Sequence, residues 1–148
     1  MLYLFGPTAG ARSQQNAFSS FLKSQEFNHK QIYTYERLFN LDLSEEDALI
    51  CGIPVDDYEK NLSTIRFLQR KTPNVFFLMD HWHNSPKNFF DQSGGKYHLP
   101  KKIFCIDEYM KESFLNAGIV EECLEVVGHP ALEKTHKEIK SPPVPQAL

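Results

Sequence analysis

The sequence predicts an α/β fold, a Rossmann-like three-layer domain with a mostly parallel sheet. Short continuous apolar runs alternate along the chain with longer segments whose apolar residues recur at helical spacing. This alternation is typical of strands that are buried on both faces of a parallel sheet and joined by helices. At 148 residues, with 41% hydrophobic and 24% charged residues, the chain is also long and apolar enough to bury a core. We therefore expect one domain of this class.

Six segments are predicted to form the strands of this sheet. Four are continuous apolar runs, a fifth, Leu124–Val127, is apolar except for Glu125, and the sixth, Gln31–Tyr35, is rich in β-branched and aromatic residues, which favour strands. In chain order the segments are Leu2–Phe5, Gln31–Tyr35, Ala48–Gly52, Val75–Met79, Ile103–Ile106 and Leu124–Val127. The stretch between the second and third segments is expected to be a polar connection.

The first two predicted helices are recognised by apolar residues that recur every three or four positions. The first helix follows the loop Gly6–Arg12, and its apolar face is expected to consist of Ala17, Phe18, Phe21 and Leu22. The second begins with Asp56 and Glu59, which are spaced as a capping box, and it ends before Pro73. Its apolar face is expected to consist of Tyr58, Leu62, Ile65 and Leu68.

The third helix has a predicted residue at each boundary. Asp107 is expected to be its N-cap, and Gly118 is placed to end it as the C′ residue. Met110, Phe114 and Ala117 should then face the core. Both ends and the inward face of this helix are therefore defined by the sequence.

Two stretches are predicted to lie outside the regular elements. Residues 85–100 form one long irregular connection, in which Gly94 and Gly95 suggest mobility. After residue 132 the chain becomes polar and then rich in proline, which cannot join a sheet or a helix interior. We expect residues 1–132 to form the domain and residues 133–148 to form a linker or tail.

Composition excludes several classes of protein. The formal net charge is −3 and basic residues are not concentrated in runs, so a nucleic acid is not an expected partner. No apolar run approaches the roughly 20 residues of a membrane span, the N-terminus lacks the features of a secretion signal, and nothing indicates a membrane surface as a partner. Cys51, Cys105 and Cys123 are odd in number and far apart, which suits unpaired thiols in a reducing compartment. We expect a cytoplasmic protein.

The predicted sheet brings polar residues to one edge. In open parallel sheets ligands bind beyond the carboxyl ends of the strands, where loops and helix N-termini converge. The residues delivered there are expected to be Gly6, Thr8, Gly10, Gly52, Pro54, Asp80, His81, His83, Asp107, Glu108, Gly128, His129 and Pro130. This shared placement is the main functional signal in the sequence.

The loop that follows the first strand has two interpretations. Gly6 and Gly10 could let backbone N–H groups approach a phosphate or a sugar, with Thr8 between them, beside the N-terminus of the following helix. The loop matches neither the dinucleotide-binding glycine fingerprint nor the P-loop pattern. Alternatively it is a tight strand-to-helix turn, and loop statistics do not separate the two interpretations.

Residues 80–83, Asp-His-Trp-His, have three interpretations. Asp80 or His81 could act as a general base toward an attacking hydroxyl, because a histidine titrates near neutral pH. His81 and His83 could instead bind a metal, with a third ligand from Asp91, His98 or His129 at no diagnostic spacing. The third interpretation is structural, with Asp80 capping backbone groups and Trp82 covering the core. A substrate site is favoured, and no metal is expected.

Each of the last two rim segments has a structural and a functional interpretation. Gly128 should permit an unusual backbone turn, and His129 after it either faces the ligand edge or caps a neighbouring loop. Asp107 and Glu108 fit an N-cap and a first-turn charge of the third helix, which also places Glu108 at the rim as a substrate-binding candidate.

A family resemblance follows from these segments. The strand, glycine-containing loop and helix at the start, followed by Pro100–Lys134, resemble the N-terminal half of GT-B glycosyltransferases and of related sugar-nucleotide 2-epimerases. In those enzymes a helix that ends at glycine leads to a short strand and a Gly-Asn-Pro motif. The stretch NAGIVEECLEVVGHPALE is similar, with His129 where asparagine is usual, and FFLMDHWHN resembles the strand end on the acceptor side of the cleft. The first loop departs from the family because it lacks a histidine after its glycines.

The resemblance implies the acceptor-binding half of a glycosyltransferase of surface glycan biosynthesis, inactive alone. Its expected partners are a nucleotide sugar, a glycan acceptor and a C-terminal donor-binding domain, without a metal or other cofactor. Asp80 or His81 would be the base, the Gly6–Gly10 loop would position the acceptor, and His129 would line the cleft. The alternatives are an α/β module that binds a sugar, nucleotide or protein without catalysis, and one half of an epimerase.

Overall fold

The computed structural model describes residues 1–52, 58–81 and 86–133, and its centre is a six-stranded sheet. The strands are β1 (Leu2–Phe5), β2 (His29–Ile32), β3 (Ala48–Gly52), β4 (Asn74–Leu78), β7 (Lys102–Cys105) and β8 (Leu124–Val126). They lie in the order β2-β1-β3-β4-β7-β8, and every neighbouring pair is parallel. The predicted α/β, Rossmann-like fold with a parallel sheet is confirmed.

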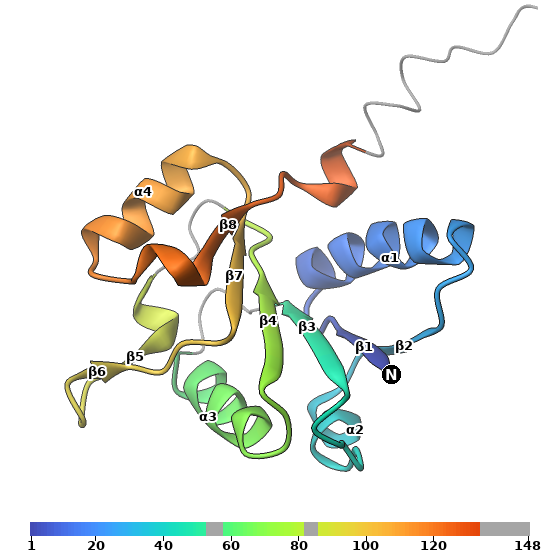
Figure 1. Ribbon diagram of the computed structural model, residues 1–148, viewed down its shortest axis with the longest axis horizontal. Coiled ribbons are helices and arrows are strands. Elements are labelled where there is room, and N and C mark those ends of the chain that lie inside the picture. Colours follow the sequence, from blue (N-terminus) through green and yellow to red (C-terminus); the bar gives the residue numbers. More distant parts are fainter. Residues whose placement is uncertain (53–57, 82–85, 134–148) are drawn as a thin grey trace, which may run out of the picture.

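Helices lie on both sides of this sheet. Helix α1 (Ala9–Ser24) is on one side, and α3 (Tyr58–Gln69) and α4 (Glu108–Asn116) are on the other (Figure 1). The chain passes outward from β1 to β2 and then returns to β3 on the far side of β1. The strand order therefore reverses between β1 and β3, and such a switch point is where open α/β sheets place their ligands.

The main core lies on the side of the sheet that faces α3 and α4. Phe77 of β4 packs edge-on against Phe89, with 5.7 Å between the ring centroids, and Phe89 in turn contacts Phe114 of α4. Cys51 and Cys105 are fully buried in their strands, as predicted. Burial of several phenylalanines contributes most here, since each large side chain removed from water contributes about 1.5–3 kcal/mol.

Helix α4 has the boundaries that the sequence predicts. The backbone N–H of Met110 donates to Oδ1 of Asp107 at 2.9 Å, so Asp107 is the N-cap. Gly118 has φ +91°, and the N–H of Ile119 reaches back to the carbonyl of Phe114 at 3.1 Å. This left-handed glycine ends the helix. Met110 and Phe114 are buried, whereas Ala117 is exposed as the C-cap, contrary to its predicted inward position.

The second strand is shorter than predicted, and a helix follows it. Strand β2 ends at Ile32, and α2 (Tyr35–Phe39) begins within the segment predicted as Gln31–Tyr35. The hydroxyl oxygen of Thr34 accepts from the N–H of Arg37 at 3.3 Å, and Leu38 of this helix is fully buried. The β-propensity of the segment was overridden by this N-cap and by one buried leucine.

Two helices bury a face that agrees only in part with the predicted one, since Leu22, Ile65 and Leu68 are buried as expected. In α1 Phe21 is 57% exposed and Phe18 is half-buried, and the buried residues are instead Ala11, Gln14, Gln15, Ser19 and Leu22. In α3 Tyr58 is exposed, and Asn61 and Thr64 are buried beside Ile65 and Leu68. In α1 small and polar side chains occupy the contact because the helix approaches the sheet closely at Gly52. In α3 the side-chain amide of Asn61 is buried because it donates to Oδ1 of Asn88 at 2.7 Å.

Residues 86–100, the described part of the predicted irregular connection, contain regular elements. A 3-10 turn, η1 (Pro86–Phe89), leads into the antiparallel pair β5 (Phe90–Asp91) and β6 (Lys96–Tyr97). Gly95 takes φ +62° and its N–H donates to the carbonyl of Asp91 at 2.8 Å, which closes the turn. The predicted helix start at Asp56 and the predicted tail from residue 134 lie outside the described residues.

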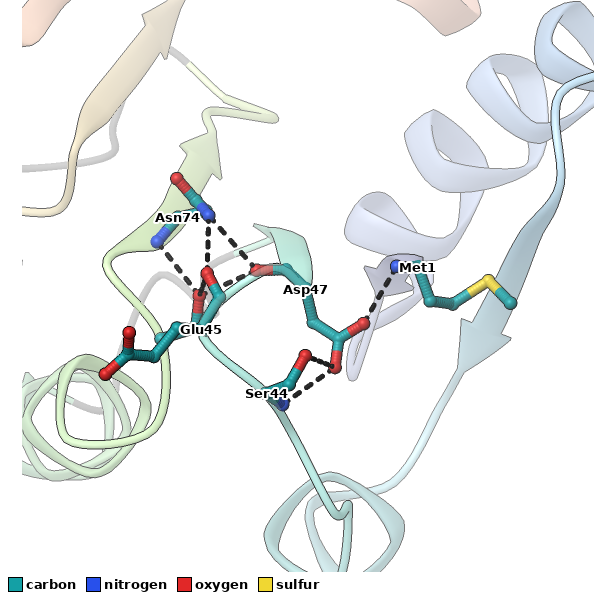
Figure 2. A network of polar contacts seen from close by, with 6 residues as sticks. Met1, Ser44, Glu45, Asp47 and Asn74 are labelled. Atoms are coloured by element: carbon teal, nitrogen blue, oxygen red, sulfur yellow. Dashed lines mark hydrogen bonds and ion pairs between the residues drawn. The ribbon is translucent and has the colours of Figure 1, made fainter.

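A polar network ties together the amino ends of β1, β3 and β4 (Figure 2). The α-ammonium of Met1 donates to Oδ1 of Asp47 at 2.8 Å, and the Ser44 N–H donates to Oδ2 of the same carboxylate at 2.8 Å. These two partners lower the pKa of Asp47 to about 2. The side chain of Asn74 donates to the Glu45 carbonyl at 3.0 Å. This end of the sheet is closed by its own residues, so the opposite end remains for a ligand.

Candidate functional site

The candidate site is the rim at the carboxyl ends of β1, β3 and β4. Helix α1 begins there, because Thr8 accepts a hydrogen bond from the N–H of Ala11 at 3.3 Å and acts as the N-cap. The helix lies tightly on the switch point, since a Cβ placed on Gly52 would be 2.4 Å from the Cβ of Ala11. The loop is therefore a tight strand-to-helix turn that also brings the helix N-terminus to the rim.

Two buried glutamines fix α1 to the strand ends. The side-chain amide of Gln15 donates to the carbonyls of Phe5 and Ile50 at 3.3 and 3.2 Å, and so bridges both strands of the switch point. The amide of Gln14 donates to the Met79 carbonyl at 2.7 Å, just beyond β4. Both side chains are 1% exposed. The sequence analysis missed them. The signal that could have found them is their helical spacing, because Gln14 and Gln15 lie three or four residues from Ala11 and on the same face as Ser19 and Leu22.

Asp80 and Gly10 meet at the rim. A Cβ placed on Gly10 would lie 2.6 Å from Oδ2 of Asp80, so the carboxylate rests against bare backbone in the first turn of α1. A carboxylate beside a helix N-terminus interacts favourably with the helix dipole. A side chain at Gly10 would therefore displace the Asp80 carboxylate from this position. The structure brings together a loop glycine and a strand-end aspartate that the sequence placed at the same edge.

His129 also reaches this point and is held in one orientation. Its Nδ1 accepts the backbone N–H of Leu132 at 3.2 Å, and its Nε2 lies 3.3 Å from the Asp80 carbonyl. Because Nδ1 is the acceptor, Nε2 carries the proton and donates to that carbonyl. Gly128 before it has φ +83°, the predicted unusual turn. His129 therefore acts as a clamp on the backbone of Asp80.

The remaining predicted rim residues lie around this centre. His81 is exposed directly after Asp80. Glu108 is exposed in the first turn of α4, after β7, which is the neighbour of β4. His83 lies outside the described residues. Asp80, Gly10 and His129 are joined by contacts, and Glu108 flanks them one strand away.

The other residues considered as metal ligands are engaged elsewhere. Asp91 forms an ion pair with Arg66, and His98 lies 3.6 Å from the same carboxylate. Hydrogen bonds from Ser93 and the Gly94 N–H, with the charge of Arg66, lower the pKa of Asp91 to about 2. Across residues 1–52, 58–81 and 86–133, no group of three His, Cys, Asp or Glu side chains is arranged to hold a metal.

The one arginine of the first loop and helix turn is committed to the fold. The guanidinium of Arg12 donates to the Gly6 carbonyl at 3.2 Å and to the Tyr33 carbonyl at 3.5 Å. Its carbon lies 5.6 Å from the centroid of the Tyr33 ring, a cation–π distance. The cation nearest the loop is thus engaged with backbone oxygens and an aromatic ring.

Comparisons with known proteins identify no family. No protein-family model matches the chain, and no curated protein matches it in sequence. Among solved structures the chain is similar to a protein from Salmonella typhimurium LT2 provisionally described as sugar binding, with 15% identity and a TM-score of 0.43. The similarity covers 77% of this chain and 33% of that protein, so the chain spans about a third of its length. At this level of similarity no function is transferred to the chain.

Within the described residues, no helix is both long and apolar enough to cross a membrane.

Proposed function

We propose that the domain is a binding module that holds an uncharged, hydroxyl-rich ligand, such as a sugar, at the rim of β1, β3 and β4. The observation that carries the proposal is the position of the Asp80 carboxylate against the bare backbone of Gly10. An ionised carboxylate oxygen accepts hydrogen bonds from hydroxyl groups and offers no donor, and Oδ2 of Asp80 is the oxygen that lies beside Gly10. Its location beside the switch point is where a ligand of this fold class is expected.

Electrostatics favour an uncharged ligand over a phosphate. A helix N-terminus usually attracts anions, but the carboxylate of Asp80 already lies against the first turn of α1. A phosphate placed there would be repelled by Asp80. It would also find the guanidinium of Arg12 engaged by the Gly6 and Tyr33 carbonyls. A neutral sugar hydroxyl, which donates to the carboxylate, meets neither obstacle.

The rim residues have distinct roles in this proposal. Gly10 leaves room for the carboxylate and for ligand atoms that approach the helix backbone. His129 fixes the backbone of Asp80 through the 3.3 Å contact, which limits the entropy lost when the ligand binds. His81 and Glu108 are exposed and can contact the outer side of the ligand. Thr8 supports the site as the helix cap, and His83 stays a predicted contact.

Saturation-transfer NMR with a panel of monosaccharides tests the proposal. Glucose, N-acetylglucosamine and N-acetylgalactosamine are the probes, with inorganic phosphate as the charged comparison. We expect at least one sugar to bind, and Asp80→Asn to weaken it about tenfold, since a hydrogen bond to a charged acceptor is worth about 1.5–3 kcal/mol against 0.5–1.5 for a neutral one. Glu46→Gln, an exposed acid before β3 at the opposite end of the sheet, is the matched control. Binding of phosphate by a protein that binds none of the sugars would contradict the assignment of the rim to an uncharged ligand.

A second candidate function is the acceptor-side half of a GT-B glycosyltransferase. It is favoured by the same carboxylate, because Asp80 at the rim could accept the proton of an attacking hydroxyl. The resemblance of residues 116–133 to the family supports it. His129, in contrast, donates from Nε2 to a carbonyl and accepts at Nδ1, so it orients and does not act as the base.

This second candidate makes a separable prediction. The chain alone should bind an acceptor sugar, should not bind uridine diphosphate, and should transfer no sugar from a nucleotide sugar. A radiolabelled UDP-N-acetylglucosamine assay with each monosaccharide measures transfer, and calorimetry measures binding of the nucleotide. Turnover by these 148 residues, or tight nucleotide binding at the rim, would contradict the half-enzyme interpretation.

A further inference from the structure

A large hollow lies beside α1 and adjoins the rim site at Pro130. Its volume is about 790 Å³. The sheet contributes Ile50 of β3, Leu78 of β4 and Phe104 of β7, and α1 contributes Phe18 and Phe21. None of Gly10, Asp80, His81 or His129 is among the described residues that line it. Because Phe18 and Phe21 of α1 line it, the hollow is on the side of the sheet that α1 partly covers.

Among the described residues, only the short helical turn at 130–133 reaches this part of the sheet beside α1. Helix α1 contacts β1, β2 and β3, while α3 and α4 contact β4, β7 and β8 from the other side. A parallel sheet is normally covered on both faces. Here Phe76 and Phe104 stack on each other at 5.7 Å and both remain half-buried. The apolar face of β4, β7 and β8 beside α1 is therefore incomplete.

Helix α1 also has apolar side chains that face the hollow. The sequence predicts Ala17, Phe18 and Phe21 as the buried face of this helix, yet these residues line the hollow instead. Phe21 is 57% exposed, and Val127 at the opposite wall is 41% exposed. Apolar side chains from two elements thus face the same open space. Contiguous exposed apolar surface of this kind marks an interaction site.

We propose that this hollow is a docking groove for a basic amphipathic α-helix supplied by a partner protein. Three neighbouring strands at about 4.8 Å spacing leave a width of about 10 Å, which equals the diameter of one helix. Glu125 and Glu133 line the groove and are exposed. Lys102 lies 3.9 Å from Glu125 and offsets part of its charge. The groove therefore fits a helix with an apolar face flanked by lysine or arginine.

Charge and sequence argue against two other occupants. A second copy of this chain, packed about a two-fold axis, would bring the acidic residues Glu125 and Glu133 toward their own equivalents. The chain's residues after Glu133 read KTHKEIKSPPVPQAL. Ile139 is the one aliphatic residue before the prolines of this stretch, so its sequence carries cations without an apolar face.

The test uses the full chain and a synthetic helical peptide of about 16 residues with leucines at helical spacing and flanking lysines. Fluorescence anisotropy of the labelled peptide measures affinity. We expect binding that Phe21→Ala weakens about tenfold. Phe27→Ala is the matched control, because Phe27 is 53% exposed and outside the groove, and it should change affinity by less than about twofold. A charge-reversed peptide with glutamates for lysines should bind several-fold more weakly.

Other outcomes overturn the proposal in distinct ways. Equal binding of both peptides, binding of neither, or no effect of Phe21→Ala would show that the groove does not select a basic helix. Dimerisation in sedimentation experiments that Phe21→Ala abolishes would assign the groove to a second copy. Amide shifts of residues 134–148 that accompany Phe21→Ala in NMR spectra of the full chain would assign it to the chain itself.

Discussion

Gly52→Ala probes the contact that seats α1 on the switch point. In an ordinary strand position without crowding, replacing glycine by alanine stabilises a protein by about 0.4–1 kcal/mol, because the unfolded chain loses freedom. In this protein a Cβ on Gly52 would lie 2.4 Å from the Cβ of Ala11 and 3.2 Å from its Cα. Destabilisation by Gly52→Ala would therefore support the close contact between α1 and β3, and stabilisation would argue against it.

The magnitude follows from the overlap. Carbon atoms in contact prefer about 3.5–4.0 Å, so α1 and β3 must separate by about 1 Å to admit the new methyl group. Overpacking of this kind costs about 1–3 kcal/mol. At about 2–4 °C per kcal/mol for a chain of this size, the melting temperature should fall by roughly 2–12 °C.

Urea unfolding followed by circular dichroism measures the change in free energy, with the Ala11→Gly variant and the double variant completing a cycle. Ala11→Gly alone costs about 1 kcal/mol through helix propensity. It also removes the opposing methyl group. The double variant should therefore lose less free energy of unfolding than the two single variants lose together. Rescue will be partial, because the Cα of Ala11 stays 3.2 Å from the new Cβ. A Gly52→Ala variant that equals or exceeds the wild type in stability, with additive effects, would refute the close contact.

Three further predictions concern charge, thiols and the helix cap. The pKa of Asp47 is lowered to about 2 in the folded state from an ordinary 3.8, so its contribution to stability is present above about pH 4 and is lost as the pH falls toward 2. When the pH is lowered from 5 to 2.5, the urea midpoint of the wild type should therefore fall, and that of Asp47→Asn should fall less. Burial raises the pKa of the Cys51 thiol, and burial raises that of Cys105 to about 11, so a disulfide reagent at pH 8 should label half-buried Cys123 first and the other two only on unfolding, and rapid native labelling of all three would contradict this. Thr8→Ala should destabilise the domain by about 0.5–2 kcal/mol in the same urea assay while Thr8→Ser retains the cap, and equal losses in both variants would argue against a capping role.

The sequence was sufficient for five of the six strands of the central sheet, to within one residue at each end, and for one helix. Continuous apolar runs such as Ala48–Gly52 match β3 residue for residue, because a strand buried on both faces leaves no polar position. Asp107 and Gly118 bound α4 as predicted, since caps act through local hydrogen bonds and local backbone angles. Features that depend on residues close to one another in the sequence were therefore predictable.

Helix orientation was harder to predict, because it depends on what lies across the contact. The apolar pattern of α1 pointed to Phe18 and Phe21, but the sheet at the switch point admits only small or hydrogen-bonding side chains such as Ala11 and Gln15. Likewise Tyr35 has high strand propensity, and the Thr34 cap with buried Leu38 turned its segment into α2. Tertiary contacts decided both cases.

The rim could be predicted as a location, and its internal contacts could not. The carboxyl-end rule placed Gly10, Asp80 and His129 at one edge, and the structure brings them into contact. That His129 clamps the Asp80 backbone as a neutral donor, and does not present a free ring nitrogen, depends on the backbone N–H of Leu132 three residues later. No spacing rule in the sequence encodes that hydrogen bond.

The most direct test of the rim as the binding site is amide shift mapping by ¹H–¹⁵N NMR during titration with the monosaccharide that binds best. The account predicts that the largest shifts fall on the amides of Gly10, Asp80 and Leu132, the last reporting on the His129 ring, and that Asp80→Asn removes them. Shifts confined to the groove beside Phe21, to the β5–β6 turn, or to the Met1–Asp47 end of the sheet would contradict it.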